Sequence, residues 1–204
     1  IRAALRESNG LLGNYQVEVV VKDHKGNPRR SQYHLEQFIS DERALAVFGG
    51  LHSPPLIQYR DFINDNKILT LVPWAAATPI TRAKDDNNWI FRLSIDDSKA
   101  GKTIVKDLIE NSNYRAPYLF LEDSGWGRAN EITITRALFE SKLKISGQHY
   151  FHWGVSELEA KAAIIKAIFK GADSVIFVGN APEGIQFAKA MLSLPVKNHL
   201  SIRS

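Results

Sequence analysis

Histidine side chains are the first candidates for chemistry in this sequence, because imidazole binds metal ions and transfers protons near neutral pH. Only His149 and His152 lie close together along the chain. If both belong to one strand, their odd separation places them on opposite faces, so they cannot hold one metal ion unless the strand ends between them. The other histidines stand alone, at positions 24, 34, 52 and 199. We therefore predict no metal site and interpret the histidines as surface residues or residues at the rim of a cleft.

Phosphate binding and nucleophilic catalysis are the next possibilities. The nearest match to a dinucleotide fingerprint is residues 125–130, Gly-Trp-Gly-Arg-Ala-Asn, in which asparagine stands where close helix–strand packing needs glycine or alanine. Ser124 follows a predicted strand, but its neighbours lack the glycines of a nucleophile elbow. The acidic pairs 85–86 and 96–97 are as typical of turns and helix caps as of acid–base catalysis. The sequence predicts no catalytic residues and no cofactor, which indicates that the protein is not an enzyme.

The composition excludes other classes of protein. The chain has 204 residues, of which 44% are hydrophobic and 24% charged, and it has no cysteine, so burial alone must hold the fold together. No apolar run approaches the roughly 20 residues of a membrane span. The net charge is only +4, and the tightest basic cluster, Lys22 to Arg30, is interrupted by Asp23. A nucleic-acid-binding surface needs a basic patch or stripe, so no nucleic-acid partner is predicted.

The elements that must position any functional residues follow from the alternation of short strand-like runs with helical periodicity. Strands are predicted at 17–21, 46–49, 68–72, 89–92, 118–121, 145–151 and 174–178. Helices are predicted at 30–40, 54–64, from Asp97 onward, at 127–141, around 158–169 and at 183–194. Repeated strand–helix units form parallel sheets with helices on both faces. The predicted fold class is α/β, with two lobes of doubly wound parallel sheet at residues 1–93 and 94–204.

Ligands bind such folds at the carboxyl ends of the strands, where loops converge. Four loops qualify, at residues 49–53, 73–78, 123–126 and 179–182. Two of them belong to each predicted lobe, so a ligand held by all four would lie in a cleft between the lobes. The chain opens on a helix-like run and closes on a strand-like one, which suggests the central piece of a longer polypeptide.

Five stretches carry a resemblance to a known family: 19–28, 49–53 (Gly-Gly-Leu-His-Ser), 68–73, 91–97 and 122–127 (Glu-Asp-Ser-Gly-Trp-Gly). In this order and spacing, they resemble the periplasmic solute-binding proteins of branched-chain amino acid and amide ABC transporters. The resemblance covers essentially the whole chain. It implies a periplasmic protein that captures a small polar organic ligand by hinge closure and delivers it to the membrane permease of the transporter.

The resemblance also implies that parts of the fold lie outside this chain. The first strand of the first lobe would precede Ile1 and lie between the strands at 17–21 and 46–49, so those two should not be neighbours. The acidic residue that binds a ligand ammonium group in this family would follow Ser204.

By the same resemblance, Ser53 would donate its hydroxyl to a ligand carboxylate, aided by backbone N–H groups around Trp74 and Ala75. Alternatively, Ser53 would simply cap the helix that follows it. His52 shares its loop and is also expected to contact the ligand. The family has a threonine where this chain has Ala76, unless the loop is shifted so that Thr78 supplies the hydroxyl, and this departure puts a branched-chain amino acid in doubt.

In the second lobe, Trp126 occupies the aromatic position of the family's loop and could face Trp74 across the cleft. Two opposed indoles would suit an aromatic, amide or cationic ligand. Asn180 stands where the family has an aromatic residue. Asp97, at a helix start, either caps that helix or binds an amino or amide N–H group of the ligand.

The predicted ligand is therefore amino-acid-like, an amide or an aromatic acid. Two alternatives remain open at this point. One is a ligand-sensing receptor or regulatory domain of the same fold, and the other is a doubly wound α/β enzyme.

Overall fold

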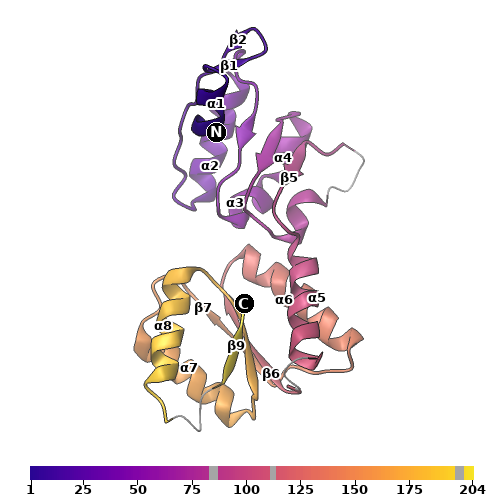
Figure 1. The fold of residues 1–204 in the computed structure, drawn as a ribbon, viewed down its shortest axis with the longest axis vertical. Coiled ribbons are helices and arrows are strands. Elements are labelled where there is room, and N and C mark those ends of the chain that lie inside the picture. Colours follow the sequence, from indigo (N-terminus) through magenta and orange to yellow (C-terminus); the bar gives the residue numbers. More distant parts are fainter. Residues whose placement is uncertain (83–86, 111–113, 196–199) are drawn as a thin grey trace.

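The computed structural model describes residues 1–82, 87–110, 114–195 and 200–204. Two lobes lie end to end along the long axis of the molecule (Figure 1). The first lobe contains α1 (Arg2–Glu7), β1 (Leu11–Leu12), β2 (Tyr15–Gln16), α2 (Pro28–Ile39), β3 (Val47–Phe48), α3 (Ser53–Gln58), α4 (Arg60–Asp65), β4 (Thr70–Val72), the 3-10 helix η1 (Thr78–Thr81) and β5 (Ile90–Arg92). The second contains α5 (Asp97–Glu110), β6 (Pro117–Glu122), α6 (Gly125–Glu140), β7 (Gly147–Phe151), α7 (Glu157–Phe169), β8 (Ser174–Val178), α8 (Ala181–Leu192) and β9 (Ser201–Arg203).

The first lobe is built on a parallel sheet in the order β3-β4-β5. One face of this sheet packs against α2, α3 and α4, and the core between them includes Leu35, Leu56, Ile63, Ile68, Val72 and Ile90. The register places Phe48, Leu71 and Phe91 side by side on the other face. The two phenyl rings of that face are about half exposed, so helices α2 to α4 cover only one side of the sheet.

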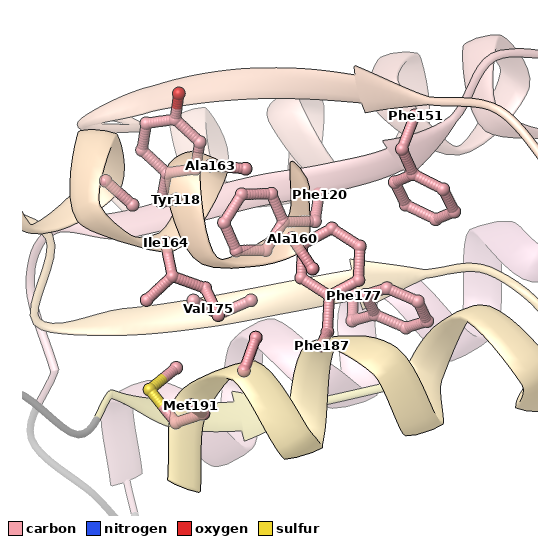
Figure 2. Close-up of a cluster of buried hydrophobic side chains, with 12 residues drawn as sticks. Tyr118, Phe120, Phe151, Ala160, Ala163, Ile164, Val175, Phe177, Phe187 and Met191 are labelled. Atoms are coloured by element: carbon pink, nitrogen blue, oxygen red, sulfur yellow. The ribbon is translucent and has the colours of Figure 1, made fainter. Parts of the chain in front are cut away.

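The second lobe contains a parallel four-stranded sheet in the order β7-β6-β8-β9. Every residue of β6 and β8 is buried, because these central strands are covered on both faces. On one face, α7 and α8 enclose an aromatic cluster that includes Phe120, Phe151, Phe177 and Phe187 (Figure 2). On the other face, α5 and α6 pack on Leu119, Leu121 and Ile176. The parallel sheets and their flanking helices confirm the predicted α/β fold.

The chain passes from the first lobe to the second through residues 93–96, between β5 and α5. Asp96 fixes this connector. Its carboxylate accepts hydrogen bonds from Arg92 Nη2 at 2.5 Å and Thr78 Oγ1 at 2.7 Å. Arg92 in turn donates to the carbonyl oxygens of Ala76 and Ala77, at 2.9 and 2.8 Å. The connector is therefore tied to the loop that follows β4.

Two predicted elements are wrong in detail. The predicted strand at 17–21 joins no ladder among the described residues, and Val20 and Val21 are 66% and 70% exposed. A strand needs a neighbour for its backbone groups, and apolar composition does not supply one. The predicted helix at 54–64 is divided into α3 and α4, which meet at Tyr59. The predicted start at Asp97 is confirmed for α5, whereas α6 begins at Gly125 because Ser124 caps it by accepting from Gly127 N–H.

Candidate functional site

Ser53 is the first residue of α3 and is 4% exposed. It does not cap the helix, since His52 occupies the cap position without a side-chain bond. Instead, the Ser53 hydroxyl oxygen accepts a hydrogen bond from the backbone N–H of Ala77 at 3.4 Å. The interpretation of Ser53 as a simple cap is therefore wrong, and its side chain joins the loop after β3 to the loop after β4.

The loop after β4 alternates buried and exposed residues. Trp74 is 68% exposed, whereas Ala75 and Ala77 are 2% and 0% exposed and belong to the core of the first lobe. The carbonyl oxygen of Ala76 accepts from Asp97 N–H at 3.0 Å as well as from Arg92. This loop therefore connects the core of the first lobe to the first turn of α5 in the second lobe.

Thr78 begins η1, and its hydroxyl donates to Asp96. Burial by itself would raise the pKa of Asp96, but hydrogen bonds from Ser98 and Thr78 and the nearby Arg92 charge hold that pKa well below its usual range. The Thr78 hydroxyl thus stabilises an ionised carboxylate at the connector in this structure.

Asp97 lies at the start of α5 and is 7% exposed. Its Oδ2 accepts from Trp126 Nε1 at 2.8 Å and from Asn130 Nδ2 at 2.7 Å. Burial raises the pKa of Asp97, and the two hydrogen bonds act in the opposite direction. Trp126 is half-buried and packs on the cores of both lobes, so this pair lies where α6 meets the first lobe.

Asn180 occupies the cap position of α8 but makes no side-chain bond to that helix. Its Nδ2 donates to Glu122 Oε2 at 2.8 Å, and Glu122 is 2% exposed at the carboxyl end of β6. The bond fixes the amide with its nitrogen toward Glu122. Asn180 therefore directs its carbonyl oxygen away from that carboxylate.

Residues after β7 contribute to the junction between the lobes, and our sequence reasoning missed them. The ring of Trp153 lies 4.9 Å from the ring of His52, centroid to centroid. The rule used for the other loops could have found Trp153, because this residue lies two positions after the carboxyl end of the predicted strand at 145–151.

A second missed cluster lies on α6 and β7. The Arg128 guanidinium is 3.6 Å from the centroid of the Tyr150 ring and pairs with Asp123 at 2.6 Å. The Tyr150 hydroxyl donates to Glu131. Burial, followed by this hydrogen bond, raises the pKa of Tyr150 to about 12. At neutral pH Tyr150 is therefore uncharged, and it donates to Glu131 while its ring lies against the Arg128 guanidinium.

The structure brings some expected site residues together and leaves others apart. Asp97 bonds directly to Trp126, and Ser53 bonds to the loop that carries Trp74 to Thr78. No ring contact joins Trp74 to Trp126 in the described part of the chain. Within the same ranges, no three His, Asp or Glu side chains are placed to hold a metal ion. No described helix combines the length and the apolar character that crossing a membrane requires.

Comparison with known proteins places this fold. The sequence profile of the family described as periplasmic binding protein matches residues 1–197. No curated protein matches the sequence. A periplasmic binding protein from Burkholderia mallei has a TM-score of 0.87 at 14% identity, over 100% of this chain and 53% of that one.

Two further solved structures are similar. The solute-binding protein of an ABC transporter from R. palustris, in complex with 4-hydroxybenzoate, has a TM-score of 0.83 at 18% identity, over 98% of this chain and 54% of that one. A leucine-binding protein from Thermotoga maritima has a TM-score of 0.78 at 16% identity, over 89% of this chain and 50% of that one. The chain therefore spans about half the length of these structures, and at such identities the likeness is one of fold. With its family profile matched along nearly the whole sequence, the chain belongs to the periplasmic binding protein family.

Proposed function

We propose that this chain binds a small organic carboxylate between its two lobes, without covalent chemistry, and serves a membrane permease of an ABC transporter from the periplasmic side. The observation that carries the proposal is that loops at the carboxyl ends of both sheets meet. His52, after β3, contacts Trp153, after β7. A Cβ placed on Gly125, after β6, would lie 3.5 Å from Ile57 of α3. The carboxyl ends of the strands in both lobes, where α/β folds bind their ligands, thus lie against each other at these loops.

The first lobe would supply the donors for the carboxylate. Ser53 Oγ accepts from Ala77 N–H at the long distance of 3.4 Å. Among the described residues its own proton meets no acceptor, so the hydroxyl can donate to the ligand. Hydrogen bonds to a charged group contribute about 1.5–3 kcal/mol. A carboxylate is the proposed ligand group because 4-hydroxybenzoate and leucine, the molecules named for two similar structures, both carry one.

The second lobe would bind the other end of the ligand. Because the Asn180 nitrogen already donates to Glu122, its carbonyl oxygen remains as the acceptor. That oxygen suits a phenolic hydroxyl or an ammonium group. Trp126 would add apolar surface beside Asp97, while its N–H stays bound to that carboxylate.

Isothermal titration calorimetry with 4-hydroxybenzoate and leucine tests the proposal. We expect at least one of them to bind, and the Ser53→Ala variant to bind it about 10- to 100-fold more weakly because one charge-assisted hydrogen bond is lost. Ser40→Ala is the matched control, since Ser40 is an exposed first-lobe serine whose hydroxyl donates to Gln37 O, three residues before it. If neither compound binds, the proposed ligand class is wrong. Equal affinities of Ser53→Ala and Ser40→Ala would remove Ser53 from the site.

A further inference from the structure

The proposed function uses the contact between His52 and Trp153 as evidence that the lobes meet, and it gives Trp153 itself no role. It lies in the turn between β7 and α7, in the second lobe. Its neighbours are first-lobe residues: the ring of His52 at 4.9 Å, and Gly26. A Cβ built on Gly26 would lie 2.5 Å from Cη2 and 3.0 Å from Cζ3 of Trp153. The six-membered ring of the indole therefore rests directly on the Gly26 backbone.

The turn that carries Trp153 is held by its own lobe. Gly154 N–H donates to Glu183 Oε1 at 3.1 Å, and Glu183 lies in the first turn of α8, 6% exposed. Val155 N–H donates to His152 O at 3.2 Å, which closes the turn. The backbone of the turn that carries the indole is thus held by hydrogen bonds within the second lobe.

The surface that receives the indole is equally well formed. Gly26 has a φ of +67°, a conformation that favours glycine, and its N–H donates to His24 Nδ1 at 2.9 Å. The His24 ring packs on Gly50, where a Cβ would lie 2.7 Å from Nε2. Asn27 then caps α2 by accepting from the N–H groups of Arg29 and Arg30. Two surfaces from different lobes meet here, and each is held by hydrogen bonds within its own lobe.

We propose that Trp153 is a closure residue that holds the two lobes together at Gly26 and His52, and so controls ligand release. In Figure 1, β7 lies on the opposite side of the second lobe from α5, which follows the connector, so this contact secures a side that the connector does not. His52 immediately precedes Ser53, and the contact therefore borders the proposed ligand site. The role in ligand release rests on the proposed function, whereas the contact itself does not.

The contact is tested first without any ligand. The chain has no cysteine, so Lys25→Cys, an exposed position beside Gly26, accepts a single bimane label whose fluorescence tryptophan quenches on contact. We expect the fluorescence to rise when Trp153 is changed to Phe and to stay the same when the exposed Trp74 is changed to Phe. An unchanged signal in the Trp153→Phe protein would overturn the proposal, whatever the protein binds.

A double-mutant cycle then tests the closure role. Gly26→Ala and Gly13→Ala both place alanine at a positive φ, +67° and +59°, but only the Cβ at position 26 meets Trp153, because nothing lies within 4 Å of the one at position 13. Losing the indole contact should speed dissociation of 4-hydroxybenzoate about tenfold in Gly26→Ala and in Trp153→Ala. Gly13→Ala should leave the rate unchanged, and Gly26→Ala should add nothing once Trp153 is alanine.

The outcomes separate the two proposals. Additive effects of Gly26→Ala and Trp153→Ala, or equal effects of Gly26→Ala and Gly13→Ala, would overturn the closure role. If quenching depends on Trp153 but neither 4-hydroxybenzoate nor leucine binds the unmodified protein, the contact stands. In that case the proposed ligand class and the control of its release both fail.

Discussion

Two neighbouring carboxylates at the connector have opposite environments. Asp96 is held ionised by Arg92, Thr78 and Ser98, so its pKa is lowered despite burial. In the described part of the chain, Asp97 accepts hydrogen bonds from the neutral donors of Trp126 and Asn130, and burial raises its pKa. Burial of a charge costs free energy unless it is compensated, and only one of these two side chains has a cationic partner in direct contact. Asp96 therefore contributes stability that is lost as the pH falls, whereas Asp97 contributes stability that is lost as the pH rises.

We expect Asp97→Asn to gain stability relative to the unmodified protein as the pH is raised from 4 to 7. A carboxyl group whose folded pKa is raised contributes stability that is fully present below its unfolded pKa and is lost as the pH rises through the folded pKa. The asparagine keeps an acceptor oxygen for Trp126 and carries no charge. Urea denaturation at several pH values gives the difference in unfolding free energy.

Asp97→Ala is the control for that prediction. It removes the acceptor and leaves the N–H groups of Trp126 and Asn130 without their partner, which should cost about 2–3 kcal/mol at every pH. A difference between Asp97→Asn and the unmodified protein that does not vary with pH would contradict the raised pKa.

At the scale of elements, the start of α6 depends on a close approach between helix and strand. Gly127 lies in the first turn of α6, where a Cβ would be 1.9 Å from the carbonyl oxygen of Glu122 at the end of β6. The neighbour is backbone, which cannot rotate away as a side chain can. The close approach brings Trp126 and Asn130 within reach of Asp97, so the glycine helps to position the site.

We expect Gly127→Ala to destabilise the protein by more than about 2 kcal/mol, because the helix start must move away from β6. Gly184→Ala in α8 is the matched control. Its Cβ would meet Phe177 at an ordinary 3.5 Å, and alanine favours a helix over glycine by about 1 kcal/mol. Thermal unfolding should therefore show a lower midpoint for the first variant and an equal or higher one for the second. A Gly127→Ala protein as stable as the Gly184→Ala protein would mean that α6 is not held against β6.

At the scale of the whole molecule, the two lobes share apolar packing near the connector. Ala129 of α6 is buried with residues of the first-lobe core, and Trp126 packs against that core and against the core of the second lobe. Within the described residues, the lobes therefore meet at α6 beside the connector and at Trp153. Movement of one lobe relative to the other must loosen at least one of these contacts.

Trp126→Ala removes packing from the cores of both lobes. It should therefore lower the unfolding free energy by at least about 2 kcal/mol. It should also increase the radius of gyration, which small-angle X-ray scattering measures. Trp126→Phe loses the hydrogen bond to Asp97 but keeps an aromatic ring between the lobes, so its radius should match that of the unmodified protein. An unchanged radius in Trp126→Ala would mean that this side chain does not hold the lobes together.

The sequence by itself determined the parallel α/β architecture and most helices and strands. These follow from local periodicity, since a side chain's position in a helix or strand decides whether it faces a core. The resemblance also implied that Asp97 and Trp126 both belong to the ligand site, and the structure joins these two side chains by a hydrogen bond. That the nine expected site residues contact a ligand remains a prediction.

Only the tertiary structure decided which partner each polar or aromatic group finds. The strand-like run at 17–21 pairs with no described strand, Ser53 bonds to the loop after β4 instead of capping its helix, and Trp153 packs on Gly26 and His52. Ser53 and its partner Ala77 are 24 positions apart in the chain, and Trp153 and Gly26 are 127 apart. Local patterns carry no information about such distant partners. Burial and hydrogen bonding select the partner of Ser53 once the first lobe is folded, and those of Trp153 only when both lobes are assembled.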